Sequence, residues 1–334
     1  MTSRRRFIQQ SSLALTALAL PFPLTAFTKY NKMTDNKNFD VIIIGGSYAG
    51  LSSAMALGRS LRNVLIIDSG KPCNIQTPHS HNFLTQDGKT PKEISKLAKQ
   101  EVEKYETVKF HKGLAISGVK TENGFEITTD INEKFTAKKL IFATGIKDTM
   151  PDIKGFSECW GISIIHCPYC HGYEHRYQNT GIIANGQRAF HLASMVNNLS
   201  DKVTILTNGK ADFSSEQLEK LNNHGIKIIE TKISEIEHQN GQLKNLIFTD
   251  GSKKSFDVAY GAIPFTQHSD IPVSLGCELT EQGYIKIVAF QKTTVPNIYV
   301  CGDNSNMMRS VANAVSSGNI AGAVANGELV QEQF

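Results

Sequence analysis

The sequence has little of what marks a membrane, nucleic-acid-binding or disulfide-rich protein. No uninterrupted apolar run approaches about 20 residues, so a polytopic membrane protein is excluded and we expect no stable membrane span. The net charge is only +4, and three of these charges are Arg4, Arg5 and Arg6, so composition does not support a nucleic-acid partner. Six cysteines in 334 residues are too few for a disulfide scaffold, and 40% hydrophobic with 20% charged residues excludes a disordered chain.

The first thirty residues have the pattern of an export signal. Three arginines precede an apolar stretch at residues 13–20, and the small residues Thr25 and Ala26 follow it. Residues 3–9 resemble a twin-arginine signal, although a buried helix or a single membrane anchor is the alternative. We therefore expect residues 1–30 to direct the protein to the periplasm, with a cytoplasmic location as the alternative.

The mature chain opens with a dinucleotide-binding pattern. The β-branched run Phe39–Ile44 leads into a glycine-rich turn and a helix, and a second strand ends at Asp68. Ser47 stands where the middle glycine of the G-x-G-x-x-G motif is expected, so the motif is incomplete, and glycines that serve only packing are the alternative. The predicted cofactor-binding residues of this unit are Gly45, Gly46, Ser47, Tyr48, Ala49, Gly50 and Asp68.

The far end of the chain carries a second signal for a flavin. Residues 293–303 predict a strand that ends in Gly302 and Asp303, and residues 311–321 predict a helix of small residues. This resembles the C-terminal flavin signature of two-dinucleotide flavoproteins, in which such an aspartate binds the ribityl chain of FAD. The alternative for Asp303 is a helix cap. The two ends together favour FAD as the cofactor.

A second nucleotide-binding unit follows in mid-chain, and its motif is also incomplete. Ala184 stands where the first glycine is expected, whereas Gly186 and Ala189 fit the motif. The next strand, residues 202–207, ends without an acidic residue, and no arginine occurs from Ala189 to Met308. We expect the fold of a nicotinamide domain but leave the binding of NAD(P)H open. The motif that resembles the crossing between the two domains consists of Ala143, Thr144 and Gly145.

The segment from His166 to Glu174 is the predicted redox centre. Cys167 and Cys170 have the spacing of a redox-active pair, and His166 and His171 flank them and can move the proton of thiol–disulfide exchange. A c-type haem attachment site, half of a zinc site and a glutaredoxin-like motif are the alternatives. The other four cysteines are dispersed, so we expect no metal site.

The order of these motifs resembles the thioredoxin reductase family over residues 39–334. The sequence around Cys167 and Cys170, together with residues 78–88 and 151–156, looks like the branch of gliotoxin- and holomycin-type dithiol oxidases. His171 departs from the family, which usually has aspartate at that position. The resemblance implies that Cys170 exchanges electrons with the flavin, Cys167 meets the substrate sulfur, His171 is an acid/base, and the protein is a homodimer.

The predicted fold class is α/β, with two Rossmann-like (three-layer ββα) dinucleotide-binding domains, the second inserted in the first. We predict an FAD-binding domain at residues 38–147 and 285–334, and an NAD(P)-binding-like domain at 148–284 that carries the two cysteines. The predicted function is an FAD-dependent thiol–disulfide oxidoreductase.

Two directions of electron flow are open. The enzyme oxidises a small dithiol with O₂ and forms hydrogen peroxide, or it uses NAD(P)H to reduce a thioredoxin-like protein. The export signal and the missing arginines favour the oxidase. A nucleotide-binding protein with a structural disulfide is the lesser alternative.

Overall fold

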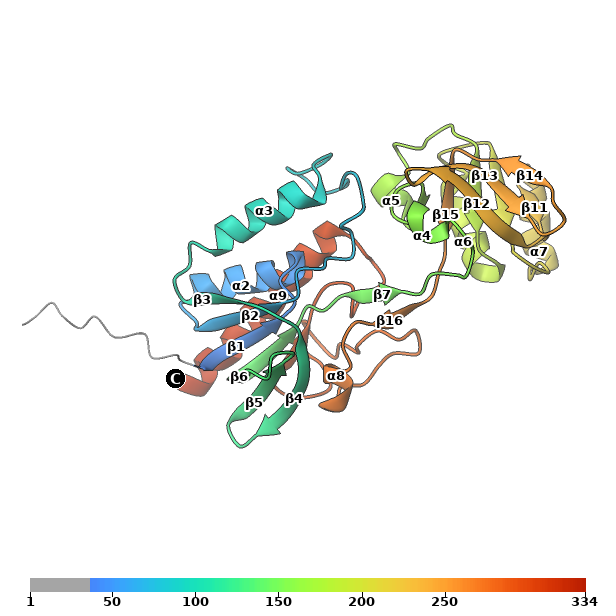
Figure 1. The fold of residues 1–334 in the computed structure, drawn as a ribbon. Coiled ribbons are helices and arrows are strands. Elements are labelled where there is room, and N and C mark those ends of the chain that lie inside the picture. Colours follow the sequence, from blue (N-terminus) through green and yellow to red (C-terminus); the bar gives the residue numbers. More distant parts are fainter. Residues whose placement is uncertain (1–36) are drawn as a thin grey trace, which may run out of the picture. The chain divides into compact units, whose positions relative to one another are not determined.

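The first glycine-rich unit forms the centre of a seven-stranded sheet in the computed structural model, which describes residues 37–334 (Figure 1). The predicted export segment, residues 1–30, lies outside the described residues. The strands are β1 (Asn38–Ile44), β2 (Val64–Asp68), β3 (Val108–Lys112), β4 (Ala115–Thr121), β5 (Gly124–Thr129), β6 (Lys134–Phe142) and β17 (Ile298–Val300). The order is β3-β2-β1-β6-β5-β4, and β17 runs parallel to the end of β6. The neighbouring strands β3, β2, β1 and β6 are parallel, so their carboxyl ends lie at one edge of the sheet, where a ligand site is expected.

The longer helices that accompany this sheet are α2 (Tyr48–Arg59), α3 (Pro91–Val102) and α9 (Val311–Gln333). Helices α2 and α9 pack backbone to backbone, because a Cβ on Gly318 would lie 2.2 Å from the Ala49 carbonyl oxygen. The Ser53 hydroxyl donates a hydrogen bond to the Gly318 carbonyl at 2.8 Å, which joins the two helices further. The small residues predicted for the C-terminal helix therefore serve close packing against the helix of the first nucleotide unit.

A lysine is buried where α9 crosses the sheet. Lys139 of β6 has no exposed side-chain surface, and its Nζ donates to Asn297 Oδ1 at 2.6 Å. The same ammonium group pairs with Glu328 at 3.2 Å and with Glu332 at 2.7 Å. Tyr299 donates its hydroxyl proton to Glu328 as well. This ion network holds the C-terminal half of α9 to the strands.

The second nucleotide unit forms a separate five-stranded sheet with the order β11-β10-β9-β15-β8, in which every pairing is parallel. Its strands are β8 (Ile164–Ile165), β9 (Thr180–Ile183), β10 (Val203–Leu206), β11 (Lys227–Ile229) and β15 (Val258–Gly261). An antiparallel sheet accompanies it, with β12 (Ile233–Gln239), β13 (Gln242–Phe248) and β14 (Lys253–Ser255). The helices of this part are α4 (Phe156–Cys159), α5 (Pro168–His171), α6 (Gly186–Val196) and α7 (Ser215–Asn223). The predicted α/β fold class is confirmed.

Two short antiparallel strands, β7 (Ile146–Asp148) and β16 (Phe265–Gln267), connect the two parts (Figure 1). Residues 271–277, predicted to belong to the inserted domain, pack instead in the core of the first sheet. This segment contains α8 (Ile271–Ser274), and Ile271, Leu275 and Cys277 are buried with the strands. The reason is local, because Gly118 of β4 leaves room for Ile271, whose Cγ2 would lie 2.8 Å from a Cβ added there. Composition does not show that the chain has already returned to the first sheet.

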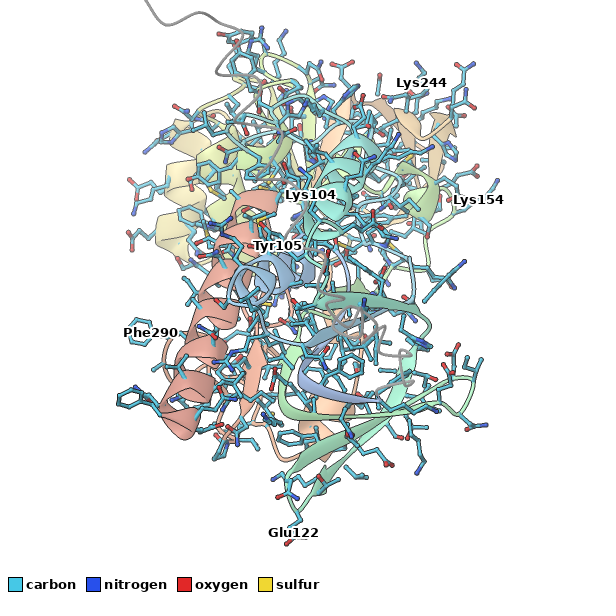
Figure 2. The ribbon with its side chains drawn as sticks, turned by 90° about the vertical axis from the view of Figure 1, so that its left-hand side faces the viewer. Lys104, Tyr105, Glu122, Lys154, Lys244 and Phe290 are labelled. Atoms are coloured by element: carbon cyan, nitrogen blue, oxygen red, sulfur yellow. The ribbon has the colours of Figure 1, made fainter. Side chains whose placement is uncertain are left out.

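No helix among residues 37–334 is long and apolar enough to cross a membrane. Several side chains at the edges of the described part extend into solvent, as Figure 2 shows for Glu122 at the turn between β4 and β5 and for Phe290. Tyr105, also labelled there, instead packs on α2: a Cβ added to Gly58 would lie 2.8 Å from the Cβ of Tyr105.

Candidate active site

The turn between β1 and α2 is built so closely that two of its glycines have no room for a side chain. Gly45 has φ +105°, and a Cβ there would lie 2.3 Å from the Ala143 carbonyl oxygen. A Cβ on Gly50 would lie 1.9 Å from the Gly45 carbonyl oxygen. Ser47 has an ordinary extended backbone, with φ −88° and ψ −164°, so serine fits where the motif has glycine.

The acidic residue at the end of β2 is held against this turn. Asp68 Oδ1 accepts a hydrogen bond from the Gly46 backbone N–H at 3.0 Å. One carboxylate oxygen is therefore used inside the protein, and this bond orients the carboxylate at the strand end where a ribose is expected. The first-turn N–H groups of α2 have no acceptors within the helix and suit a phosphate.

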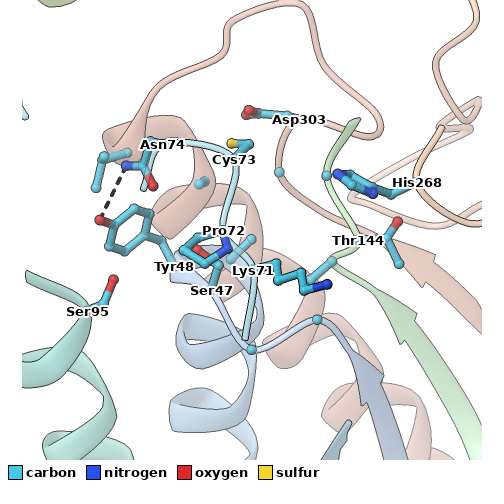
Figure 3. A pocket seen from close by; sticks show the side chains of 18 of the residues that line it. Ser47, Tyr48, Lys71, Pro72, Cys73, Asn74, Ser95, Thr144, His268 and Asp303 are labelled. Atoms are coloured by element: carbon cyan, nitrogen blue, oxygen red, sulfur yellow. Dashed lines mark hydrogen bonds between the residues drawn. The ribbon is translucent and has the colours of Figure 1, made fainter. Parts of the chain in front are cut away.

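A cavity of about 630 Å³ extends from this turn to Cys170, within the range of roughly 300–1,000 Å³ typical of ligand sites. Figure 3 shows Ser47 and Tyr48 near the segment that carries Lys71, Pro72 and Cys73, with Asp303 on the loop after β17. Gly50 packs behind the cavity, and Cys167 does not line it either. The predicted residues that do line it are Gly45, Gly46, Ser47, Tyr48, Ala49, Asp68, Ala143, Thr144, Gly145, Cys170, His171, Gly302 and Asp303.

Asp303 reaches the cavity from a buried position. Burial, with the neighbouring Asp148 carboxylate, raises the pKa of Asp303 to about 6, although Arg309 acts in the opposite direction. Gly302 beside it has φ +81°, a conformation that favours glycine. A buried carboxylate on a tight turn fits the hydroxyl groups of a ribityl chain, because these can donate hydrogen bonds to it. The turn, Asp68 and Asp303 together fit FAD.

A salt bridge that was not predicted stands beside the redox pair. Arg309 forms a bidentate pair with Asp148 of β7 at 2.9 and 3.0 Å, and Trp160 Nε1 donates to the same carboxylate at 3.1 Å. The Arg309 carbonyl oxygen lies 3.8 Å from Cys170 Sγ. Arg309 is the only arginine after Arg188, so the end of the long arginine-free stretch was the available signal in the sequence.

The two cysteines have opposite tendencies to ionise. Cys167 caps the short helix α5, and its Sγ accepts a hydrogen bond from the Cys170 N–H at 3.2 Å. Donation from the Cys170 thiol, with backbone N–H groups of Cys170 and Tyr169, lowers the pKa of Cys167. The same contact and burial raise the pKa of Cys170. Cys167 is therefore the thiolate of the reduced pair.

Both flanking histidines are neutral near pH 7. Burial, with repulsion from His81, lowers the pKa of His171 to about 4, and burial beside Arg309 lowers the pKa of His166 to about 3. A lowered pKa also makes an imidazole a weaker base, so these two rings bind a proton less readily than an exposed histidine. His81 was not predicted as part of this site; its ring centroid lies 6.2 Å from that of His171, and its Nδ1 lies 3.6 Å from Glu174 Oε1.

The turn of the second nucleotide unit is occupied by its own side chains. Asn185 Oδ1 accepts hydrogen bonds from the N–H groups of Gly186 at 2.8 Å and Asp212 at 3.0 Å. The Asp212 carboxylate lies over the same turn, since its Oδ2 is 3.5 Å from the position of a Cβ on Gly186. At the end of the next strand, the Thr207 hydroxyl donates to the Gly209 carbonyl at 2.6 Å. Two N–H groups at this turn and a hydroxyl at the end of the next strand are therefore engaged within the chain.

The family model for pyridine nucleotide-disulphide oxidoreductases matches residues 39–318. The chain belongs to this family. Among curated relatives, the thioredoxin reductase tcpT of Claviceps purpurea is 32% identical, with 90% of this chain and 97% of the relative covered. The thioredoxin reductase aclD of Aspergillus oryzae is 30% identical, with 85% and 94% covered. A crystal structure of an oxidoreductase from Agrobacterium tumefaciens superposes with a TM-score of 0.83 at 36% identity, with 88% of this chain and 99% of that chain covered.

The family confirms the predicted enzyme class and cofactor. This pyridine nucleotide-disulphide oxidoreductase is a flavin-dependent disulfide oxidoreductase that uses FAD, as the motifs at both ends of the chain predicted. No group of three or more histidine, cysteine or acidic side chains within residues 37–334 is arranged to hold a metal ion.

Proposed function

We propose that this enzyme is an O₂-dependent dithiol oxidase. A small dithiol loses two electrons and two protons and becomes a disulfide, and O₂ takes up both and becomes hydrogen peroxide. The observation that carries the proposal is the second nucleotide turn, where Asn185 occupies the N–H groups of Gly186 and Asp212, and the Asp212 carboxylate would repel a diphosphate. FAD, when bound, supplies a two-electron acceptor in the cavity that Cys170 lines.

The cysteines have the chemistry that this direction requires. In the oxidised enzyme, a substrate thiolate attacks Cys167 Sγ and breaks the Cys167–Cys170 disulfide, and Cys170 leaves and takes up a proton, because its pKa is raised. The second thiol of the substrate then attacks the substrate sulfur that is bonded to Cys167. This step forms the substrate disulfide and releases Cys167. A low pKa makes Cys167 a good leaving group.

The second candidate is an NAD(P)H-dependent thioredoxin reductase, which the names of the relatives tcpT and aclD favour. In that direction, Cys167 would attack the disulfide of a thioredoxin-like protein. The two candidates share the flavin and both cysteines, and they differ in what exchanges electrons with the flavin on the other side.

One experiment separates the two directions. The FAD-loaded protein is mixed under argon with NADPH, NADH or a dithiol, and the flavin absorbance near 450 nm is followed. We expect the dithiol to bleach the flavin within seconds to minutes and both nicotinamide nucleotides to leave it oxidised. In air, the dithiol should yield one hydrogen peroxide per disulfide. Rapid bleaching by NADPH or NADH, with no peroxide from any dithiol, would establish the reductase instead.

We further propose that the enzyme is exported through its N-terminal segment and acts as a homodimer. The pattern of three arginines and a short apolar stretch supports export, and the resemblance to thioredoxin reductases supports the dimer. Cell fractionation, with and without lysine at Arg4 and Arg5, tests the first proposal, and light scattering of the purified protein tests the second. An unchanged amount of protein in the periplasm after those changes would contradict the first proposal. A monomeric mass would contradict the second.

A further inference from the structure

We propose that Arg309 controls how readily the bound flavin takes electrons from the redox pair, and that Asp148 sets how much of the Arg309 charge takes part. Both residues line the FAD cavity, the cavity of about 630 Å³ that Cys170 also lines. The inference concerns the exchange of electrons between the cysteines and the flavin. It therefore holds for either direction of electron flow in the proposed function.

Arg309 lies where the redox pair meets the FAD cavity. Its carbonyl oxygen is 3.8 Å from Cys170 Sγ, and its side chain lines the cavity together with Asp303. Lys71 and Lys99 line the cavity as well, but both are exposed, and water screens an exposed charge. Only 15% of the Arg309 side chain is exposed, so its charge acts through a medium of low dielectric constant.

The guanidinium group of Arg309 is balanced by carboxylates and keeps one unused donor. Nη1 and Nη2 bind Asp148 at 2.9 and 3.0 Å, and Trp160 Nε1 donates to the same carboxylate at 3.1 Å. Nε is buried without a hydrogen-bond partner, and Asp303 Oδ2 lies 3.7 Å from it. Asp148 therefore holds the guanidinium in place and offsets its charge, while the Nε–H group remains available on the side of Asp303.

Electron transfer moves a negative charge into this cavity. In the reduced pair, Cys167 is the thiolate and Cys170 is the thiol. The pair closes to a disulfide and gives up two electrons and one proton, and FAD, when bound, supplies the acceptor for both. The negative charge of the Cys167 thiolate thereby passes into the cavity that Cys170 lines. A buried cation beside Cys170 favours this transfer, and a carboxylate that offsets the cation opposes it.

The charge of Arg309 also acts on the sulfur atom of Cys170. Contact with Cys167 and burial raise the pKa of Cys170, and Arg309 opposes this rise. Cys170 must lose its proton when the disulfide closes, so Arg309 assists the same transfer at the sulfur atom.

The test uses two substitutions that break the same salt bridge but change the charge in opposite directions. Arg309→Gln removes the cation, and Asp148→Asn removes the carboxylate that offsets it. Each is made in Cys170→Ser, which cannot form the disulfide, and the FAD-loaded proteins are titrated without oxygen against a dye of known potential. We expect flavin reduction to become at least about tenfold less favourable in Arg309→Gln and about tenfold more favourable in Asp148→Asn. A tenfold change corresponds to about 30 mV for a two-electron couple.

Two control variants separate charge from structure. Arg309→Lys keeps the charge without the planar fork, so its potential should lie closer to that of the parent than the potential of Arg309→Gln does. Lys147→Gln removes a positive charge next to Asp148, from an exposed position outside the cavity, and should change the equilibrium by less than about threefold. Shifts of the same sign in Arg309→Gln and Asp148→Asn would show that the bridge is only structural and would overturn the inference. The absence of any shift, or an equal shift in Lys147→Gln, would overturn it as well.

A second measurement does not depend on FAD. In Cys167→Ser, alkylation of Cys170 is followed against pH. We expect the onset of alkylation to move to higher pH when Arg309→Gln is added and to lower pH when Asp148→Asn is added. Movement in the same direction, or no movement, would contradict the assignment. Neither measurement uses a dithiol substrate or O₂, so a failure here leaves the oxidase proposal untouched.

Discussion

Replacing Cys170 by serine should lower turnover of any dithiol by at least about a thousandfold. Cys170 lines the FAD cavity and contacts the Arg309 backbone, so it is the cysteine placed to exchange electrons with the flavin. A serine hydroxyl cannot form the disulfide through which those electrons pass. The measurement is O₂ consumption with a dithiol at a matched FAD content.

The control for this prediction is Cys277→Ala. Cys277 is buried in the core of the first sheet and does not line the FAD cavity, so its loss should leave turnover within a fewfold of the wild type. A second measurement follows alkylation of Cys167 in Cys170→Ala. Because the Cys170 thiol stabilises the Cys167 thiolate, its removal should move the onset of alkylation to higher pH. Full turnover in Cys170→Ser, or an unchanged onset of alkylation, would contradict these roles.

Replacing Lys139 by alanine should lower the free energy of unfolding by about 2–3 kcal/mol, because it removes a fully buried side chain together with its ion pairs to two partly exposed glutamates. Lys139 has no exposed side-chain surface and contacts Asn297, Glu328 and Glu332. The adjacent Lys138 pairs with Asp40 at 2.9 Å from a half-exposed position, so Lys138→Ala should cost no more than about 1 kcal/mol. Urea unfolding of the three proteins at pH 7 measures the difference. Equal losses in the two variants would contradict the argument.

The same network predicts a dependence on pH. Although burial opposes it, hydrogen bonds from Lys292, Tyr299 and Lys139 lower the pKa of Glu328 to about 2, from an ordinary value of 4.5. A lowered carboxylate pKa contributes stability that is fully present above pH 4.5 and is lost as the pH falls towards 2. Unfolding between those values should therefore be steeper in the wild type than in Glu328→Gln. Identical acid-unfolding curves for the two proteins would show that this carboxylate contributes nothing.

The nucleotide units were predictable because their constraints are local. A run of β-branched residues, a turn without room for side chains and an acidic strand end lie within about thirty residues, and the backbone geometry of Gly45 and Gly50 explains why the pattern needs glycine there. Ser47 looked like a defect in the motif. Its extended backbone shows that the position does not need glycine, a distinction that depends on φ and not on spacing.

Contacts between segments distant in the chain could not be predicted in this way. Arg309 and Asp148 are separated by 161 positions, and Asn185 meets Asp212 only because two strands of the second sheet lie side by side. Residues 271–277 were misplaced for the same reason, since their apolar side chains fit either core until Gly118 is seen to make room for Ile271.

The sequence by itself determined the α/β class, the flavin unit, the redox cysteines and the missing arginines, because these depend on residue types at short fixed spacings. Only the tertiary structure decided which cysteine is the thiolate, that Asn185 binds two N–H groups at the second nucleotide turn, and that Arg309 pairs with Asp148 beside Cys170. Each of these is a property of the distance between atoms and of burial, which a linear pattern does not contain.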